Sequence, residues 1–108
     1  MSTLYFKLEG RKAVLCEAGE WSDWYEHAGN DRIVKQETLP NGLFVSTVFL
    51  GLDYSYGENN PKPILFETLV ASPMHQERDS ERCSTWEEAE EMHRRMCEKH
   101  AQALSTKE

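Results

Sequence analysis

The sequence predicts a small α+β protein in which an antiparallel β-sheet is packed with two helices, in the order ββαβββα. Runs of β-branched and aromatic residues between turn formers predict strands, and two other segments carry apolar residues at helical spacing. A length of 108 residues with 39% hydrophobic residues is sufficient for one core and too short for two. We therefore expect one domain over residues 1–104 and a frayed tail over 105–108.

The amino-terminal part predicts a hairpin followed by a helix. Residues 4–8 and 13–16 are β-prone, and Gly10 between them can supply the positive φ of a tight turn. In residues 20–28, apolar side chains recur at i, i+3, i+4 and i+7, the spacing of one helical face. They are Trp21, Trp24, Tyr25 and Ala28.

The centre of the chain predicts a three-stranded meander made of residues 32–39, 43–52 and 63–71. A two-residue turn at Asn41-Gly42 is expected, since Asn-Gly is the strongest short hairpin signal. That turn would pair Thr38 with Val45.

This register leaves both faces of the strand at 43–52 apolar. One face would carry Val34, Thr38, Val45, Thr47 and Phe49, and the other Ile33, Lys35, Phe44, Ser46, Val48, Leu50 and Leu52. Such a strand is either covered on both faces or belongs to a sheet whose second face meets another molecule.

After a polar segment at 72–82, which we expect to be a loop, residues 85–104 predict a long helix. A capping box is available as Ser84 with Glu87 or as Thr85 with Glu88. The apolar stripe of this helix consists of Trp86, Ala89, His93, Met96, Cys97, His100 and Leu104. Acidic residues lie early and basic residues late, as the helix dipole favours.

Composition argues against several classes of function. A net charge of −7 without a basic cluster opposes direct binding of nucleic acid. No segment is long and apolar enough to cross a membrane, and no signal peptide is evident, so we expect a cytoplasmic protein with three reduced cysteines. The acidity fits either ordinary solubility or imitation of a polyanion toward a basic partner protein.

Sequence patterns that would indicate a metal site or a catalytic site are weak in this chain. His93 and Cys97 are spaced to share a zinc ion on one helix, but further ligands would have to come from elsewhere, and packing of the stripe on the sheet is the favoured interpretation. We therefore expect no metal site and no cofactor. A nucleophile elbow is absent, and the hydroxyls of Ser46 and Thr47 lie in mid-strand, so we expect no catalytic residues. Glu67, on an apolar face, is either paired with Lys35 or an arginine, solvent-facing, or part of a site.

The clearest functional indication is a surface for protein contact. The loop at 53–62 places Tyr54 and Tyr56 among small and turn-forming residues, a composition that binds partners well, although both rings could instead fold over the core. We predict an interaction surface from this loop and the second face of the sheet. It comprises Phe44, Val48, Leu50, Asp53, Tyr54, Tyr56 and Glu67.

The segments NGLFVSTVFLGLDYSYG, PILFETLV and ERCSTWEEAEEMH, with EWSDWYE and RIVKQE before them, resemble a group of small phage and prophage proteins of unassigned biochemical function. The resemblance spans roughly residues 4–93 and implies an aromatic residue where Cys83 stands, which disfavours a site at that cysteine. It implies a phage context and no catalytic residues. We expect a non-enzymatic accessory protein that binds a protein partner or itself as a homodimer. The alternatives are an acidic inhibitor of a host defence protein and, less favoured, a small enzyme or metal-binding protein.

Overall fold

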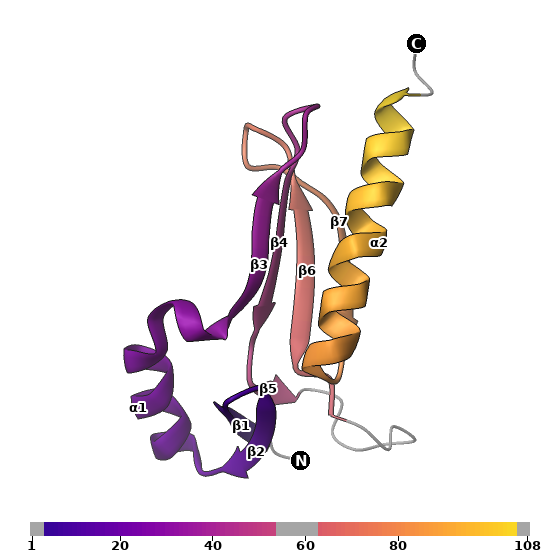
Figure 1. Cartoon of the computed structure of the whole chain (residues 1–108). Helices are drawn as coiled ribbons and strands as arrows, with labels where there is room; N and C mark the ends of the chain where they lie inside the picture. Colours follow the sequence, from indigo (N-terminus) through magenta and orange to yellow (C-terminus); the bar gives the residue numbers. More distant parts are fainter. Residues whose placement is uncertain (1–3, 54–62, 106–108) are drawn as a thin grey trace.

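A computed structural model describes residues 4–53 and 63–105, with side chains to residue 101. The described residues form two antiparallel sheets and two α-helices, which confirms the predicted α+β class (Figure 1). Residues 106–108 of the expected tail lie outside the described residues, and Ser105 still belongs to the second helix.

The larger sheet has four strands in the order β3-β4-β6-β7. The predicted meander is present as β3 (Ile33–Thr38), β4 (Phe44–Phe49) and β6 (Phe66–Ala71). Neighbouring strands are antiparallel throughout, and β4 and β6 occupy the centre of the sheet.

The fourth strand, β7 (Glu77–Cys83), corrects the expected loop at 72–82. Its sequence, ERDSERC, has no apolar alternation because β7 is an edge strand whose side chains contact charged groups on both sides. On one side Asp79 binds Lys99 at 2.9 Å and Glu81 binds Arg95 at 3.3 Å. On the other side Arg82 binds Glu67 at 3.2 Å.

The register of the β3–β4 hairpin also differs from the predicted one. Thr38 pairs with Phe44 and Glu37 with Val45, and Leu39 donates its N–H to the Leu43 carbonyl at 2.8 Å. The loop between Leu39 and Leu43 therefore contains three residues instead of two. Gly42 has a φ of 92° and donates its N–H to the Leu39 carbonyl, as in a tight turn followed by a glycine bulge. The one-residue shift moves Thr38 to the opposite face and places Glu37 on the face of Val45.

The smaller sheet has the order β2-β1-β5. The predicted hairpin is β1 (Leu4–Glu9) with β2 (Lys12–Cys16), and β5 (Leu52–Asp53) pairs with β1. The predicted strand at 43–52 is therefore divided between two sheets. It breaks at Gly51, whose φ of 77° is in the left-handed region that favours glycine.

Two helices complete the fold. The first, α1 (Ala18–Ala28), is followed by a short 3-10 turn, η1 (Gly29–Arg32), and the second is α2 (Trp86–Ser105).

Of the two candidate capping boxes at the start of α2, the structure has Thr85 with Glu88. The Thr85 hydroxyl accepts the Glu88 N–H at 3.1 Å, and the Glu88 carboxylate accepts the Thr85 N–H at 3.2 Å.

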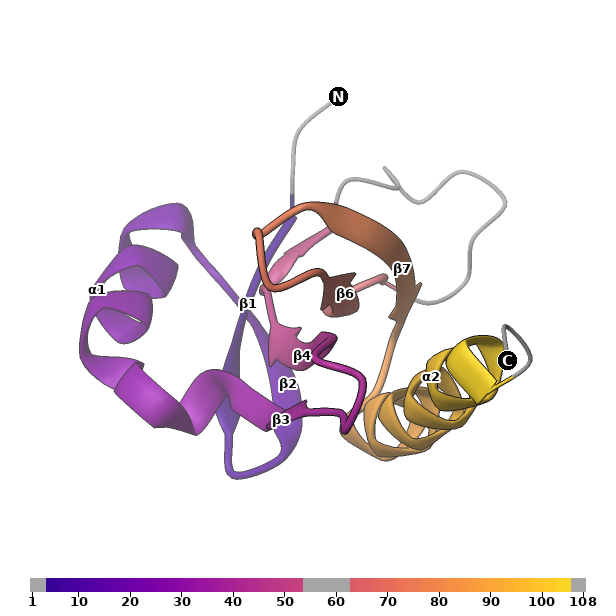
Figure 2. The same cartoon turned by 90° about the horizontal axis from the view of Figure 1, so that it is seen from above.

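The helices do not cover opposite faces of one sheet. Helix α2 lies along one face of the four-stranded sheet, whereas α1 lies beside β1 and η1 at the foot of the molecule (Figures 1 and 2). Of the predicted stripe of α2, Ala89, His93 and Met96 are buried there, together with Met92, which the prediction omitted. Trp86, Cys97 and His100 are half-buried, and the side chain of Leu104 lies outside the described residues. Two core clusters result. One joins Leu8, Phe49, Leu65, Phe66 and Ala89, and the other joins Leu39, Val45, Val70, Met92 and Met96.

Candidate functional site

One candidate site is the face of the four-stranded sheet that points away from α2, here called the outer face. Strand alternation and register place on it side chains of all four strands: Ile33, Gln36, Thr38, Phe44, Ser46, Val48, Glu67, Leu69, Ala71, Ser80 and Arg82. Neither α1 nor α2 covers this face within the described residues. Phe44 keeps 39% of its surface exposed, and Val48 and Leu69 are half-buried.

The structure divides the predicted interaction residues other than Asp53 into three groups. Phe44, Val48 and Glu67 lie together on the outer face. Leu50 is half-buried beyond the end of β4, where its N–H is donated to the Leu65 carbonyl at 2.7 Å. Tyr54 and Tyr56 lie outside the described residues.

The prediction that Asp53 belongs to the interaction surface is wrong, because its side chain is only 2% exposed and cannot offer contact area to a partner. Its carboxylate accepts the N–H of Ile64 at 3.3 Å. The sequence places Asp53 at the end of a predicted strand and at the start of the predicted loop at 53–62. Its burial follows from the pairing of β5 with β1, in which Asp53 lies opposite Leu4.

The polar groups near the middle of the outer face are paired with each other. The Glu67 carboxylate accepts two hydrogen bonds from the Arg82 guanidinium, at 3.2 and 3.3 Å, which agrees with one of the alternatives left open by the sequence, an arginine partner. Gln36 donates to the Ser46 hydroxyl at 2.9 Å. The outer face is thus partly apolar, and its charged pair is internally balanced, on a protein whose net charge is −7.

A second candidate site is the His93 cluster, defined as Glu37, His93 and Cys97. Helix α2 presents His93 and Cys97 one turn apart, and β3 brings Glu37 opposite them. His93 Nε2 lies 2.7 Å from Glu37 Oε2, and Cys97 Sγ lies 3.4 Å from the same oxygen. The three potential ligand atoms all lie within 4.8 Å of one another.

The imidazole of His93 is held in position by a hydrogen bond from the interior of the sheet. It is 2% exposed, and its Nδ1 lies 2.7 Å from the Thr47 hydroxyl, which is hydrogen-bonded in turn to Thr68. A hydroxyl, an imidazole and a carboxylate in series would suit nucleophilic catalysis if a substrate could reach the hydroxyl. Thr47 and Thr68 are both 0% exposed, so their hydroxyls serve to orient His93.

Burial and hydrogen bonding shift the pKa values of the His93 cluster. The hydrogen bond from His93 lowers the pKa of the Glu37 carboxyl below its ordinary value. Desolvation, followed by the nearby Glu37 carboxylate, raises the pKa of the Cys97 thiol to about 11. Cys97 is therefore a neutral thiol at pH 7 unless a bound cation displaces its proton.

The His93 cluster opens onto a depression of about 480 Å³ between β3 and α2. Two further carboxylates and two cationic side chains line it: Glu90, Glu98, Lys35 and Arg94. Arg94 is bound to Glu91 and to Glu98, the latter at 2.6 Å, and Lys35 lies 3.7 Å from Glu37.

Sequence reasoning identified His93 and Cys97 but not Glu37. The predicted hairpin register placed Thr38 on the α2 face and so turned Glu37 away. The signal that would have corrected it is Pro40 before Asn41-Gly42, because proline suits the first central position of a turn that ends on Gly42.

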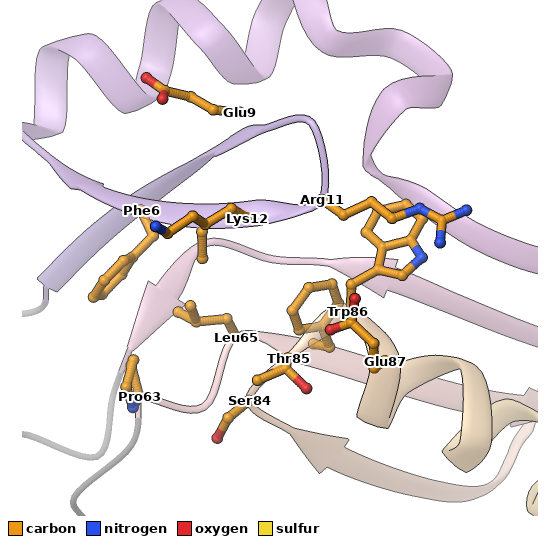
Figure 3. A pocket seen from close by; sticks show the side chains of 12 residues that line it. Phe6, Glu9, Arg11, Lys12, Pro63, Leu65, Ser84, Thr85, Trp86 and Glu87 are labelled. Atoms are coloured by element: carbon orange, nitrogen blue, oxygen red, sulfur yellow. The ribbon is translucent and has the colours of Figure 1, made fainter.

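A second depression, of about 560 Å³, lies between the amino-terminal hairpin and the start of α2. Phe6, Leu65 and Trp86 come to it from three different segments, and the Arg11 guanidinium lies 5.4 Å from the centre of the Trp86 ring (Figure 3). The N–H groups of Ser84 and Thr85, just before the adjacent helix, donate to the Glu88 carboxylate at 3.1 and 3.2 Å. A carboxylate of the chain itself therefore already lies at this helix end.

Asp79 on β7 gives a prediction about acid stability. Hydrogen bonds from Lys99 and from His100, each at 2.9 Å, lower the pKa of Asp79 to about 2. A lowered carboxyl pKa stabilises the folded state above the unfolded pKa near 4, and this contribution is lost as the pH falls from about 4 to 2. We expect it to amount to ~1 kcal/mol after discounting for solvent screening of the quarter-exposed side chain.

The measurement is urea unfolding of wild type and Asp79→Asn at pH 7, 4 and 2. The variant should be less stable than wild type at pH 7 and should approach it at pH 2. Asp23→Asn, at an exposed position on α1, is the matched control and should keep the wild-type pH dependence. A constant difference between Asp79→Asn and wild type at all three pH values would contradict the assignment.

Within the described residues, the fold and these sites define a small α+β protein with two antiparallel sheets, a partly apolar outer face and a His-Glu-Cys grouping in which the histidine is buried. Neither helix within the described residues is long and apolar enough to cross a membrane. Comparison of the chain with protein-family models, with curated proteins and with solved structures finds no match.

Proposed function

We propose that this chain is a non-enzymatic, self-associating accessory protein, acting in the cytoplasm of a phage-infected or prophage-carrying cell, whose copies meet through the outer face. The observation that supports the proposal is the apolar area on that face. Ile33, Phe44, Val48, Leu69 and Ala71 share it, and neither helix lies over it within the described residues. Burying such an area is favourable by roughly 25 cal/mol per Å².

A second copy suits this face better than a basic partner does. Two chains that each carry a net charge of −7 repel one another, so their contact must lie where local charge is balanced. On the outer face, Glu67 is already neutralised by Arg82. A two-fold contact would also bring the same apolar residues of both copies together, as self-complementary interfaces require.

The acidic-inhibitor alternative has less support among the described contacts. A protein that imitates a polyanion needs carboxylates free to meet a basic partner. Several carboxylates here are bound within the chain instead, including Glu20 to Lys7, Asp79 to Lys99 and Glu98 to Arg94.

The test is the solution mass by light scattering over a dilution series, for wild type and Val48→Lys. We expect wild type to form a dimer that dissociates on dilution, and Val48→Lys to be a folded monomer, because a charge in the centre of the contact would be buried without a partner. Ser22→Lys, an exposed site on α1, makes the same change in charge and should leave the dimer intact.

Phe44→Glu is the second variant, placed nearer the end of the sheet in case Val48→Lys fails to fold. A wild-type monomer at every concentration would refute self-association and favour a search for a host partner. A dimer that survives both folded variants would show that the outer face is not the interface.

A further inference from the structure

We propose that the His93 cluster is a metal site that binds one zinc ion through Glu37, His93 and Cys97, with water in the fourth position. This inference is independent of self-association, because the cluster lies between β3 and α2, on the side of the sheet away from the outer face.

The geometry is close to that of a zinc site. Ligand atoms at about 2.0–2.3 Å from a tetrahedral ion lie about 3–4 Å from one another. Here Sγ to Oε2 is 3.4 Å and Nε2 to Oε2 is 2.7 Å, with all three atoms within 4.8 Å. Insertion of the ion therefore requires the half-buried Glu37 carboxylate to separate slightly from His93 Nε2, whereas the distance from Cys97 Sγ to Glu37 Oε2 already suits a shared ion.

The donor chemistry also fits zinc. A carboxylate, a thiolate and a neutral imidazole together carry a charge of −2 and neutralise a divalent cation, which matters beside an imidazole that is only 2% exposed. Nitrogen, oxygen and sulfur donors in one set suit a borderline-soft ion better than they suit Mg²⁺ or Ca²⁺. In the binding step, the bond from zinc to Sγ replaces the S–H bond, and the thiol proton passes to solvent.

Thr47 supplies the outer support that metal-binding histidines use. In the zinc-bound state Nε2 gives its lone pair to the ion, so the ring proton must reside on Nδ1. The Thr47 hydroxyl, 2.7 Å from Nδ1, can accept that proton's hydrogen bond. Without the ion, the same hydroxyl can donate to Nδ1 while Nε2–H donates to Glu37, so both states leave the buried imidazole fully hydrogen-bonded.

The surroundings permit access from solvent. The depression in front of the cluster reaches Glu90 and Glu98, whose carboxylates attract a cation. Lys35, 3.7 Å from Glu37, and Arg94 oppose it, although Arg94 is engaged by Glu91 and Glu98. Within the described residues, this is the group of three or more potential ligands that meets the distance requirement for one ion.

The test uses Co²⁺ as a spectroscopic substitute for Zn²⁺ on the full, reduced chain. We expect one equivalent of Co²⁺ to produce a thiolate-to-cobalt absorption band, and Zn²⁺ to displace it. Cys97→Ser should abolish the band, and Glu37→Gln should weaken Zn²⁺ binding by at least about 100-fold. Thr47→Val, which removes the support of His93 together with the hydrogen bond to Thr68, should weaken it by about 10–100-fold.

Cys16→Ser, at a half-buried cysteine remote from the cluster, is the control and should retain both the band and the affinity. Circular dichroism establishes that each variant is folded, and Cys97→Ser and Glu37→Gln are chosen because neither alters a fully buried side chain. Absence of a thiolate band in wild type, or a band that survives Cys97→Ser or disappears in Cys16→Ser, would overturn the proposal.

Discussion

Replacement of Phe49 by Ala is expected to lower the free energy of unfolding by about 3–5 kcal/mol, the range for truncating a buried aromatic side chain. Phe49 is 0% exposed and lies where the two sheets meet. Its ring contacts Trp24 of α1 edge-on, with centroids 5.5 Å apart, and Phe66 of β6 at 5.1 Å. A loss of this size is a large part of the 5–15 kcal/mol that stabilises a typical domain.

Phe44→Ala is the matched control for this prediction, because it makes the same substitution on the same strand but on the outer face. Phe44 is 39% exposed, so the monomer should lose only about 1 kcal/mol or less. Urea denaturation of both variants at a protein concentration that keeps the chain monomeric would measure the difference. Equal losses at the two positions would mean that Phe49 is not the centre of the core.

Gly51→Ala is expected to destabilise the protein by about 3 kcal/mol. The φ of 77° costs a residue with a Cβ roughly 1–2 kcal/mol, and steric overlap in a packed site adds a similar amount. A Cβ at Gly51 would lie 2.5 Å from the Phe6 carbonyl oxygen and 2.5 Å from Trp21 Nε1. The Phe6 oxygen is backbone of the neighbouring sheet and cannot move without disturbing that sheet.

The control for Gly51→Ala is Gly10→Ala. It separates the cost of the left-handed backbone conformation from the cost of steric overlap. Gly10 has a similar φ of 64°, but a Cβ there would meet nothing within 4 Å. Its replacement should therefore cost only the conformational part, about 1 kcal/mol. Thermal unfolding of both variants provides the comparison, and a Gly51→Ala variant no less stable than Gly10→Ala would exclude the proposed overlap.

The parts of the fold that sequence could predict are those with a strong local signal. The spacing of Trp21, Trp24 and Ala28 predicted α1, and the capping residues of α2 limited its start to two choices. By contrast, β7 has no apolar alternation because its partners are charged groups on α2 and β6, which only the tertiary structure brings near. Pairing of β5 with β1 is equally long-range, since it joins Leu4 to Asp53.

In the candidate sites, too, features with a local sequence signal were predictable, and features that depend on long-range pairing were not. The face of β4 that carries Phe44 and Val48 was predictable, because strand alternation depends only on neighbours in the sequence. Burial of Asp53 was not, since it follows from the pairing with β1. The position of Glu37 depended on one residue of hairpin register, and a shift of one reverses every side chain of a strand.

The topology of the two sheets also has a consequence for the order in which the chain assembles. In the four-stranded sheet each strand pairs with the next strand of that sheet along the chain, and α2 follows the last of them directly. The smaller sheet closes only when β1 reaches β5, across β2, α1, β3 and β4. Because closing a long loop costs entropy before its contacts are made, we expect the β1–β2 hairpin and α1 to dock last, onto a preformed carboxyl-terminal unit.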